Sequence, residues 1–560
     1  MAIVQKGFVD VPHGEVHFRY GGSGPTVVLL HDSPRSSVLH IPNIEWLGEQ
    51  FTVIALDTPG YGLSSPLPSA EPSIADFAHA LDATLTALGI ERCALYGFHT
   101  SAKIALQFAV DHPQRAALTI LDGLSLSDQP PTDAFLRNYL PPFEPTADGA
   151  YIARQWAKIL DFHRYFPWFS LTAESRCALD LPDDHRLHEY ATDVFMAGAT
   201  WTGAYGAALR YQAAPVIRQL ASPTMFLCRE DDVLYDHLDK LPAPLPDQCR
   251  TVRVPAVPGA WRHRLMDLLR DAHGHHAGWS PPSLPFTAAT RGRHQRYVNL
   301  LHGQVRVGLH GRASSKVPVL LLHDLPGSPR QLEGLAALLA VDRLTLSADL
   351  PGLGESDPLP SATLGAYVSV IDETLEALGL ATVDIVAEGL GTTFAAALAA
   401  NRPRRVRRLV VDGVPMPRAR DRKRYVREYC PRILPDRAGS YLQRLWEQLR
   451  SAQMSWPWFD RAATAARVRD VELDVAAMHA TLVDSMKQLD NYGDAARAAL
   501  DAAIRDIVRG IEQPVLVLQD SRDIRYAGTG ALRRRLQTAT VGTRPTAVAE
   551  RAAMYRAFFE

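Results

Sequence analysis

The chain has 560 residues, of which 47% are hydrophobic and 21% are charged, and its formal net charge is −2. This composition is that of a soluble globular protein, and the length suffices for at least two domains with full cores. The near-zero charge excludes a general electrostatic attraction to nucleic acid or to a membrane surface.

We expect no signal peptide in the first residues, because Met1–Tyr20 lacks a basic start, an apolar core and a cleavage-site pattern. No uninterrupted apolar stretch approaches the length of a membrane span. The five cysteines are odd in number and lack metal-ligand spacing, which is typical of free thiols in a reducing compartment: Cys93, Cys177, Cys228, Cys249 and Cys430. We therefore expect a cytoplasmic protein with neither nucleic-acid nor membrane partners.

The most informative feature is a repeat of nearly the whole sequence. The pair His31-Asp32 returns as His323-Asp324, and Asp57-Thr-Pro-Gly-Tyr-Gly-Leu-Ser64 returns as Asp349-Leu-Pro-Gly-Leu-Gly-Glu-Ser356, both after 292 residues. Solenoid and propeller repeats are far shorter. The spacing therefore indicates two complete domains that arose by duplication.

The predicted elements follow the same order in both copies. Each copy opens with an alternating pattern around a His-Gly turn, typical of an antiparallel hairpin, at 8–19 and 297–307. A buried-type strand, a helix and a second strand follow, at 27–30 and 52–56 in the first copy, and an amphipathic helix then ends at Leu88-Gly89. Alternating strands and helices predict a mostly parallel sheet with helices on both faces, an α/β fold.

The domain boundaries follow from these patterns. We expect one domain over 1–270 with a helical cap at about 130–215, and a second over 297–560 with a cap at about 420–510. The segment 271–296 is rich in Gly, Pro, Ser and His and is predicted to be a linker. Its three histidines have no Cys or carboxylate partner at ligand spacing, so we predict no metal site there: His273, His275 and His276.

Both caps contain the sequence Pro-Trp-Phe, at 167–169 and 457–459, within aromatic-rich segments. These aromatic side chains either pack the cap helices or line an apolar pocket beneath the cap. Trp168 is the candidate for pocket lining.

This order of elements resembles the α/β-hydrolase family twice over. The residues that carry the resemblance are His31-Asp32 where the family has His-Gly, the segment 57–64, the helical insertion, and the strand that leads to Asp232. The resemblance implies two tandem α/β-hydrolase-like domains. It also implies a small-molecule substrate and an active site that needs no cofactor.

The family's nucleophile lies in Gly-x-Ser-x-Gly, a sharp turn from a strand into a helix. The first copy has Gly97-Phe-His-Thr-Ser101, so its elbow residue is His99, and the elbow residue of the second copy is Gly389. Neither elbow therefore holds a serine.

The resemblance also places the other members of a catalytic triad. In the first copy the acid falls on Asp232, with Asp231 as the alternative, and the only candidate for the late histidine is His263. In the second copy Asp523 fills the acid position, but the closing stretch 538–560 contains no histidine. We therefore predict that the second domain is catalytically inactive.

His99 is suited to proton transfer, because imidazole has an ordinary pKa of about 6.5. The positive end of the following helix is expected to disfavour the imidazolium and to keep His99 neutral. His99 would then activate a water molecule or attack a carbonyl carbon directly, with the backbone N–H groups of Ser33 and Thr100 facing the oxyanion. Ser101 is a second possible nucleophile or a cap of the first helical turn.

The predicted function is hydrolysis of an ester, lactone or similar bond in a small apolar substrate. Two alternatives remain open at this point: a lyase or other proton-transfer enzyme at the same site, and a ligand-binding protein without activity. Residues shared with the second copy, such as His31, Asp57 and Asp122, are predicted to order loops. The sequence leaves the oligomeric state open.

Overall fold

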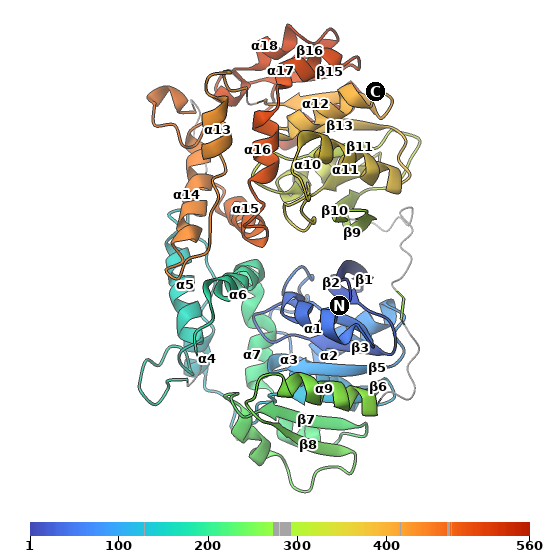
Figure 1. The fold of residues 1–560 in the computed structure, drawn as a ribbon, viewed down its shortest axis with the longest axis vertical. Coiled ribbons are helices and arrows are strands. Elements are labelled where there is room, and N and C mark those ends of the chain that lie inside the picture. The colour runs from blue at the N-terminus through green and yellow to red at the C-terminus, as the bar shows by residue number, and fades with distance from the viewer. Residues whose placement is uncertain are drawn as a thin grey trace. The chain divides into compact units, whose positions relative to one another are not determined.

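A computed structural model describes residues 1–127, 129–177, 180–272, 279–280, 293–414, 416–467, 471 and 473–560. The chain divides into two compact units (Figure 1). One comprises Met1–Glu144 and Arg154–Ser283, and the other comprises Pro145–Ala153 and Leu284–Glu560. The three linker histidines discussed above lie outside the described residues.

The first unit contains an eight-stranded sheet in the order β1-β2-β4-β3-β5-β6-β7-β8. β1 and β2 form the predicted antiparallel hairpin, β2 pairs with β4 antiparallel, and the other neighbours are parallel. The prediction of a mostly parallel sheet is confirmed. The strands are β1 (Gln5–Val11), β2 (Gly14–Gly21), β3 (Thr26–Leu30), β4 (Thr52–Leu56), β5 (Cys93–Phe98), β6 (Ala116–Asp122), β7 (Thr224–Arg229) and β8 (Cys249–Val254).

Helices of the first unit either flank this sheet or connect β6 to β7. The flanking helices are α1 (Ile41–Leu47), α2 (Ile74–Ala87), α3 (Thr100–Asp111) and α9 (Ala260–Asp271). The helices between β6 and β7 are α4 (Asp133–Tyr139), α5 (Ala150–Phe162), α6 (Asp184–Ala197), α7 (Gly203–Arg210) and α8 (Ala213–Ile217).

The second unit repeats this architecture, with the strand order β16-β15-β14-β13-β11-β12-β10-β9. Its strands are β9 (Arg293–Leu300), β10 (Gly303–His310), β11 (Val319–Leu322), β12 (Thr345–Ala348), β13 (Val383–Glu388), β14 (Val406–Asp412), β15 (Val515–Gln519) and β16 (Ala539–Thr543). Its helices are α10 (Glu333–Leu339), α11 (Leu364–Ala377), α12 (Gly391–Asn401), α13 (Arg422–Glu428), α14 (Ser440–Met454), α15 (Val475–Lys487), α16 (Asp494–Asp501), α17 (Ile504–Ile507), α18 (Thr529–Arg533) and α19 (Val548–Phe559).

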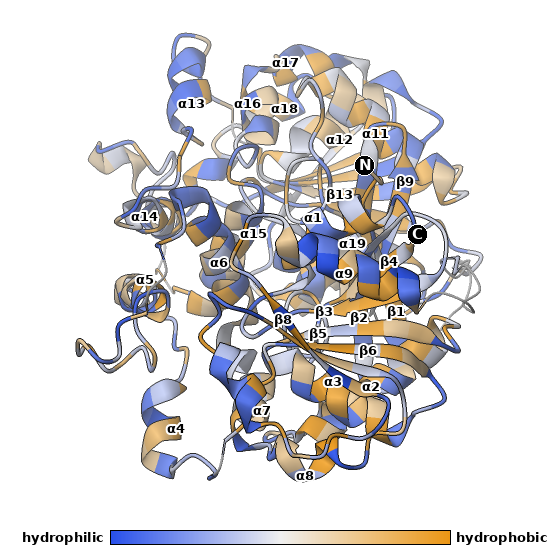
Figure 2. Ribbon diagram, turned by 60° about the horizontal axis from the view of Figure 1, so that its bottom comes forward, coloured by the Kyte–Doolittle hydropathy of each residue, from blue (hydrophilic) through white to orange (hydrophobic). Residues whose placement is uncertain are grey.

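Both faces of the first sheet are buried. Successive side chains of a strand point to opposite faces, so each central strand packs against helices on both sides. Leu29 of β3 packs in a cluster with α1 and α9, whereas Leu30 lies against Phe77 of α2 and Ile104 of α3. Figure 2 shows the strands drawn largely in the hydrophobic colour. Burial on both faces explains why the central strands are continuous apolar runs.

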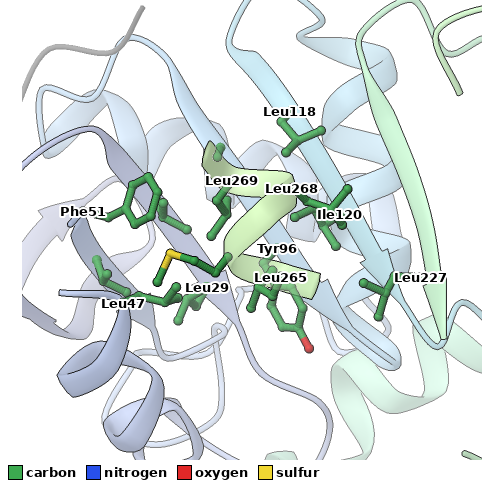
Figure 3. Packing of buried hydrophobic residues seen from close by; sticks show 14 of the residues in the cluster. Leu29, Leu47, Phe51, Tyr96, Leu118, Ile120, Leu227, Leu265, Leu268 and Leu269 are labelled. Carbon is green, nitrogen blue, oxygen red and sulfur yellow. The ribbon is translucent and has the colours of Figure 1, made fainter. Parts of the chain in front are cut away.

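The α9 face of this core provides a test of packing (Figure 3). Leu265 is 1% exposed and lies in one cluster with Leu29, Tyr96 and Ile120. We expect Leu265→Ala to lower the free energy of unfolding by about 2–5 kcal/mol, because the removed methyl groups leave a cavity in a dense core. Urea denaturation of full-length protein measures this. The exposed neighbour Arg264 is the control, and equal losses for Leu265→Ala and Arg264→Ala would contradict the prediction.

Among the described helices, none combines the length and apolarity that crossing a lipid bilayer requires.

Candidate active site

The centre of the candidate site is the turn between β5 and α3. β5 ends at Phe98, α3 begins at Thr100, and His99 between them has φ 49° and ψ −106°. Among the described residues, His99 is the only one other than glycine with a positive φ. Such a backbone costs energy and persists where the surroundings enforce it, which is typical of functional sites. The structure thus has the sharp elbow that the sequence predicts, with His99 at its apex.

A carboxylate from the end of β7 contacts this imidazole. His99 Nε2 lies 2.8 Å from Asp232 Oδ2, and Asp232 Oδ1 accepts a hydrogen bond of 2.8 Å from the backbone N–H of Leu234. The two side chains are 28% and 15% exposed, respectively. A carboxylate partner requires a proton on Nε2, which leaves Nδ1 of a neutral His99 as the proton acceptor.

The neighbouring acids determine the protonation of His99. Burial alone would lower its pKa, but the hydrogen bond and charge of Asp232, together with Asp32 and Asp122, raise the pKa above its ordinary value. The direction of this shift is opposite to the one expected from the helix dipole, because the hydrogen bond and charge of Asp232 outweigh the partial charge of a helix end. The same ion pair lowers the pKa of Asp232 despite its burial.

The two acid candidates differ in placement. Asp231 forms an exposed ion pair with Arg229, its neighbour two residues before, and only Asp232 reaches His99.

A further carboxyl group, that of Asp122 at the end of β6, interacts electrostatically with the imidazole. Its Oδ2 accepts hydrogen bonds from Tyr96 Oη at 2.7 Å and from Trp261 Nε1 at 2.6 Å. Burial raises the pKa of Asp122 to about 6. Sequence reasoning missed Trp261, because an indole is not an acid–base group. The only signal was its place two residues before His263, in the segment where the family has a histidine.

His263 itself is exposed on α9, and its side chain makes no hydrogen bond to any described residue. The structure therefore does not bring His263 into contact with His99 or Asp232, and a supporting role for it stays a prediction.

The candidate oxyanion groups are the N–H of Ser33, after β3, and the N–H of Thr100, the first residue of α3. Neither N–H donates a hydrogen bond to another described residue. Arg35, the nearby cation, donates to Asp193 Oδ2 at 2.8 Å from its Nε and lies over the ring of Tyr190. Two backbone donors, one in the loop after β3 and one at the start of α3, therefore remain available for an anion.

The Ser101 hydroxyl is already engaged. It donates to the Leu30 carbonyl at 2.8 Å and accepts from the Phe98 N–H at 3.0 Å, and no side chain caps α3. Ser101 thus ties the end of β5 to the end of β3, in place of the predicted helix cap.

Two of the three shared residues predicted to order loops, His31 and Asp57, do so in the first unit, whereas the carboxyl group of Asp122 binds the side chains of Tyr96 and Trp261. His31 Nε2 accepts from the Thr58 N–H at 2.9 Å, and Asp57 accepts from the N–H groups of Ser37 and Leu63.

The candidate pocket residue of the cap, Trp168, donates from Nε1 to the Tyr139 carbonyl at 2.9 Å and stacks on Phe162.

Gly123, directly after β6, leaves room for the His99 ring. A Cβ at this position would lie 2.4 Å from His99 Cδ2 and 2.7 Å from Nε2. We expect Gly123→Ala to displace the imidazole from Asp232 and to lower kcat by about 100-fold, which is typical of a 1 Å misplacement. Gly89→Ala is the control, because Gly89 also has a positive φ but no atom within 4 Å of its added Cβ. Equal activity of both variants, measured with the best substrate, would contradict this role of Gly123.

The corresponding site of the second unit is filled by its own side chains. Asp324 Oδ1 accepts from the N–H groups of Leu325 and Leu390, each at 2.8 Å, and these two groups correspond to the oxyanion donors of the first unit. Asp523 forms ion pairs with Arg467 and Arg525. The elbow residue, Gly389, contributes no side chain.

Comparisons with known proteins agree with this architecture. A family model described as alpha/beta hydrolase fold matches residues 25–252 and 317–523. A fluoroacetate dehalogenase of Burkholderia sp is 31% identical over 124 residues, which cover 21% of this chain and 40% of that protein. An uncharacterized protein of Mycobacterium bovis is 36% identical over 104 residues, which cover 19% of this chain and 30% of its own. The chain thus spans only about a third of the length of these curated relatives.

Among solved structures, an epoxide hydrolase from Vigna radiata has a TM-score of 0.38 at 19% identity. The match covers 48% of this chain and 97% of the epoxide hydrolase chain. An epoxide hydrolase from an endophytic Streptomyces has a TM-score of 0.37 at 23% identity. That match covers 48% of this chain and 95% of the Streptomyces chain. Because the family model matches well over half of the residues, in two successive regions, this chain belongs to the alpha/beta hydrolase fold family.

Proposed function

We propose that the N-terminal domain hydrolyses an ester, lactone or similar bond of a small, largely apolar substrate, with His99 as the base. Family membership supports a hydrolase-type enzyme. The observation that carries the proposal is the 2.8 Å contact between His99 Nε2 and Asp232 Oδ2 at the apex of a strained elbow. This contact leaves the opposite ring nitrogen free to accept a proton.

In the proposed reaction, His99 Nδ1 takes a proton from a water molecule as the water oxygen attacks the carbonyl carbon. The Asp232 carboxylate holds the ring orientation and stabilises the imidazolium that forms. The imidazolium then returns its proton to the leaving oxygen as the carbon–oxygen bond breaks. The products are a carboxylic acid and an alcohol, and His99 is neutral again.

The carbonyl oxygen gains negative charge when the water attacks. The N–H groups of Ser33 and Thr100 are the donors that we assign to this oxyanion, because both are unpaired among the described residues and Thr100 begins α3. The aromatic cap residues, including Trp168, are assigned to the apolar part of the substrate. The proposal gives no role to a metal or cofactor.

The raised pKa of His99 favours a second candidate at the same site. An imidazolium at this position is an acid, and an acid–base residue without a covalent step is what a lyase needs. Such an enzyme would move a proton within the substrate without adding water.

Product analysis in ¹⁸O-labelled water tests the proposal on the full-length protein. The substrates are short aryl and alkyl esters and lactones. Fluoroacetate is added because one relative is named a fluoroacetate dehalogenase. Hydrolysis is expected to place ¹⁸O in the carboxylic acid. Turnover without ¹⁸O would favour the proton-transfer candidate, and the absence of turnover with all substrates would contradict the proposed hydrolysis.

A further inference from the structure

Asp32 is a half-buried residue whose carboxyl group the reaction above does not use. It directly follows His31 at the end of β3, where the resemblance to the family predicts a glycine, and it directly precedes the oxyanion candidate Ser33. Its Oδ1 is buried and has no hydrogen-bond partner among the described residues. An unpaired polar atom in such a place costs free energy and calls for an explanation.

The second unit shows what the same carboxyl group does when the elbow has no side chain. Asp324, the counterpart of Asp32, binds both oxyanion N–H groups through one oxygen. A Cβ at the elbow residue Gly389 would lie 2.0 Å from the Asp324 carboxyl carbon. The carboxylate therefore occupies the oxyanion position only because the elbow residue is glycine.

His99 has the Cβ that Gly389 lacks, so this arrangement is sterically excluded in the first unit. The structure agrees, because Asp32 binds neither the Ser33 N–H nor the Thr100 N–H. The carboxyl group, next in the chain to Ser33 and within electrostatic reach of His99, thus leaves both N–H groups unbound.

Burial raises the pKa of Asp32, whereas Arg35, His99 and His31 lower it less strongly. Other titratable groups that interact with Asp32 come from β5 and from the cap: Tyr96, His163, Tyr190 and Tyr205. Imidazolium and carboxylate stabilise each other, so a neutral His99, which the base reaction needs, also favours a neutral Asp32.

We infer that Asp32, as a neutral carboxylic acid, donates a further hydrogen bond to the oxyanion beside the N–H groups of Ser33 and Thr100. This inference rests on the proposed hydrolysis. The proton stays on Asp32 throughout, so the step changes no bond other than the hydrogen bond. An ionised carboxylate there would instead repel the developing negative charge, whereas a carboxylic acid kept neutral by its surroundings can act as a donor.

Two substitutions test this role. Asp32→Asn keeps a donor of the same shape, so we expect kcat within about 10-fold of wild type, and we expect the loss of rate with rising pH that comes from ionisation of Asp32 to disappear. Asp32→Ala removes the donor, and kcat is expected to fall by about 100- to 1,000-fold. The inference is overturned if Asp32→Ala is as fast as wild type or faster, or if Asp32→Asn is as slow as Asp32→Ala.

An infrared difference spectrum tests the protonation of Asp32 without any substrate. At neutral pH, wild type minus Asp32→Asn should show the band of a protonated carboxyl group, and Asp122→Asn serves as the spectral control for the other buried acid. If no ester or lactone is turned over, the proposed hydrolysis fails, while this band still supports a neutral Asp32. Absence of the band overturns the inference even if the hydrolysis stands.

Discussion

His99→Ala is expected to lower kcat/KM for the best ester or lactone by about 1,000-fold or more, because the variant removes the proposed base and leaves only binding and the oxyanion donors. General-base catalysis alone contributes about 100- to 10,000-fold. The circular dichroism spectrum of the variant should match that of wild type, because the His99 ring is partly exposed and its removal takes no packing contacts out of the core. The measurement is steady-state turnover of purified full-length variant and wild type.

Ser101→Ala is the matched control, because Ser101 lies two residues away and is the other possible nucleophile. Its hydroxyl is bound to the Leu30 carbonyl and the Phe98 N–H, so we expect its loss to change kcat by less than about 10-fold. The reverse result, an active His99→Ala and an inactive Ser101→Ala, would show that Ser101 and not His99 is the reacting residue.

Much of the fold follows from the sequence alone. The repeated order of motifs predicted two α/β domains, and the segment 52–56 was predicted as a strand and is β4. These predictions hold because strands buried on both faces are apolar runs and because Gly89, with φ 72°, ends a helix as expected. Local chemistry is sufficient for such features.

The candidate site was only partly predictable, because it joins residues that are far apart in the chain. The resemblance placed Asp232 in the acid position, but its direct contact with His99 was not predicted, and the contact of Trp261 with Asp122 depends on how α9 packs across the sheet. The direction of the His99 pKa shift was predicted wrongly for the same reason. His99 was expected to respond to a helix end alone, whereas in the fold the Asp232 carboxylate contacts its ring and raises its pKa.

The residues around the elbow of the second copy differ in charge from those of the first. Asp412, the counterpart of Asp122, accepts hydrogen bonds from Arg544 at 2.8 Å and from Tyr555 at 3.0 Å. Arg551, 290 residues after Trp261, pairs with Glu388, whose pKa burial raises to about 7. Ion pairs with arginine thus engage Glu388 and Asp412, which correspond to Phe98 and Asp122 of the first copy. This difference supports the prediction that the second domain is inactive.

Asp232→Asn is expected to lower kcat by about 1,000-fold although it barely changes the shape of the site. The carboxylate fixes the proton of His99 on Nε2, whereas an amide nitrogen at the same place can donate to Nε2 and shift the proton to Nδ1, which then no longer accepts one. Loss of the negative charge also removes the main cause of the raised His99 pKa.

The pH profile separates this role from a structural one. A base must be neutral, so activity rises with pH through the His99 pKa, and in Asp232→Asn the remaining activity should rise at a lower pH than in wild type. Asp231→Asn is the control, because its ion pair with Arg229 is exposed and does not reach His99; both its kcat and its pH profile should match wild type. An Asp232→Asn profile with an unshifted acidic limb would show that Asp232 does not control the protonation of His99.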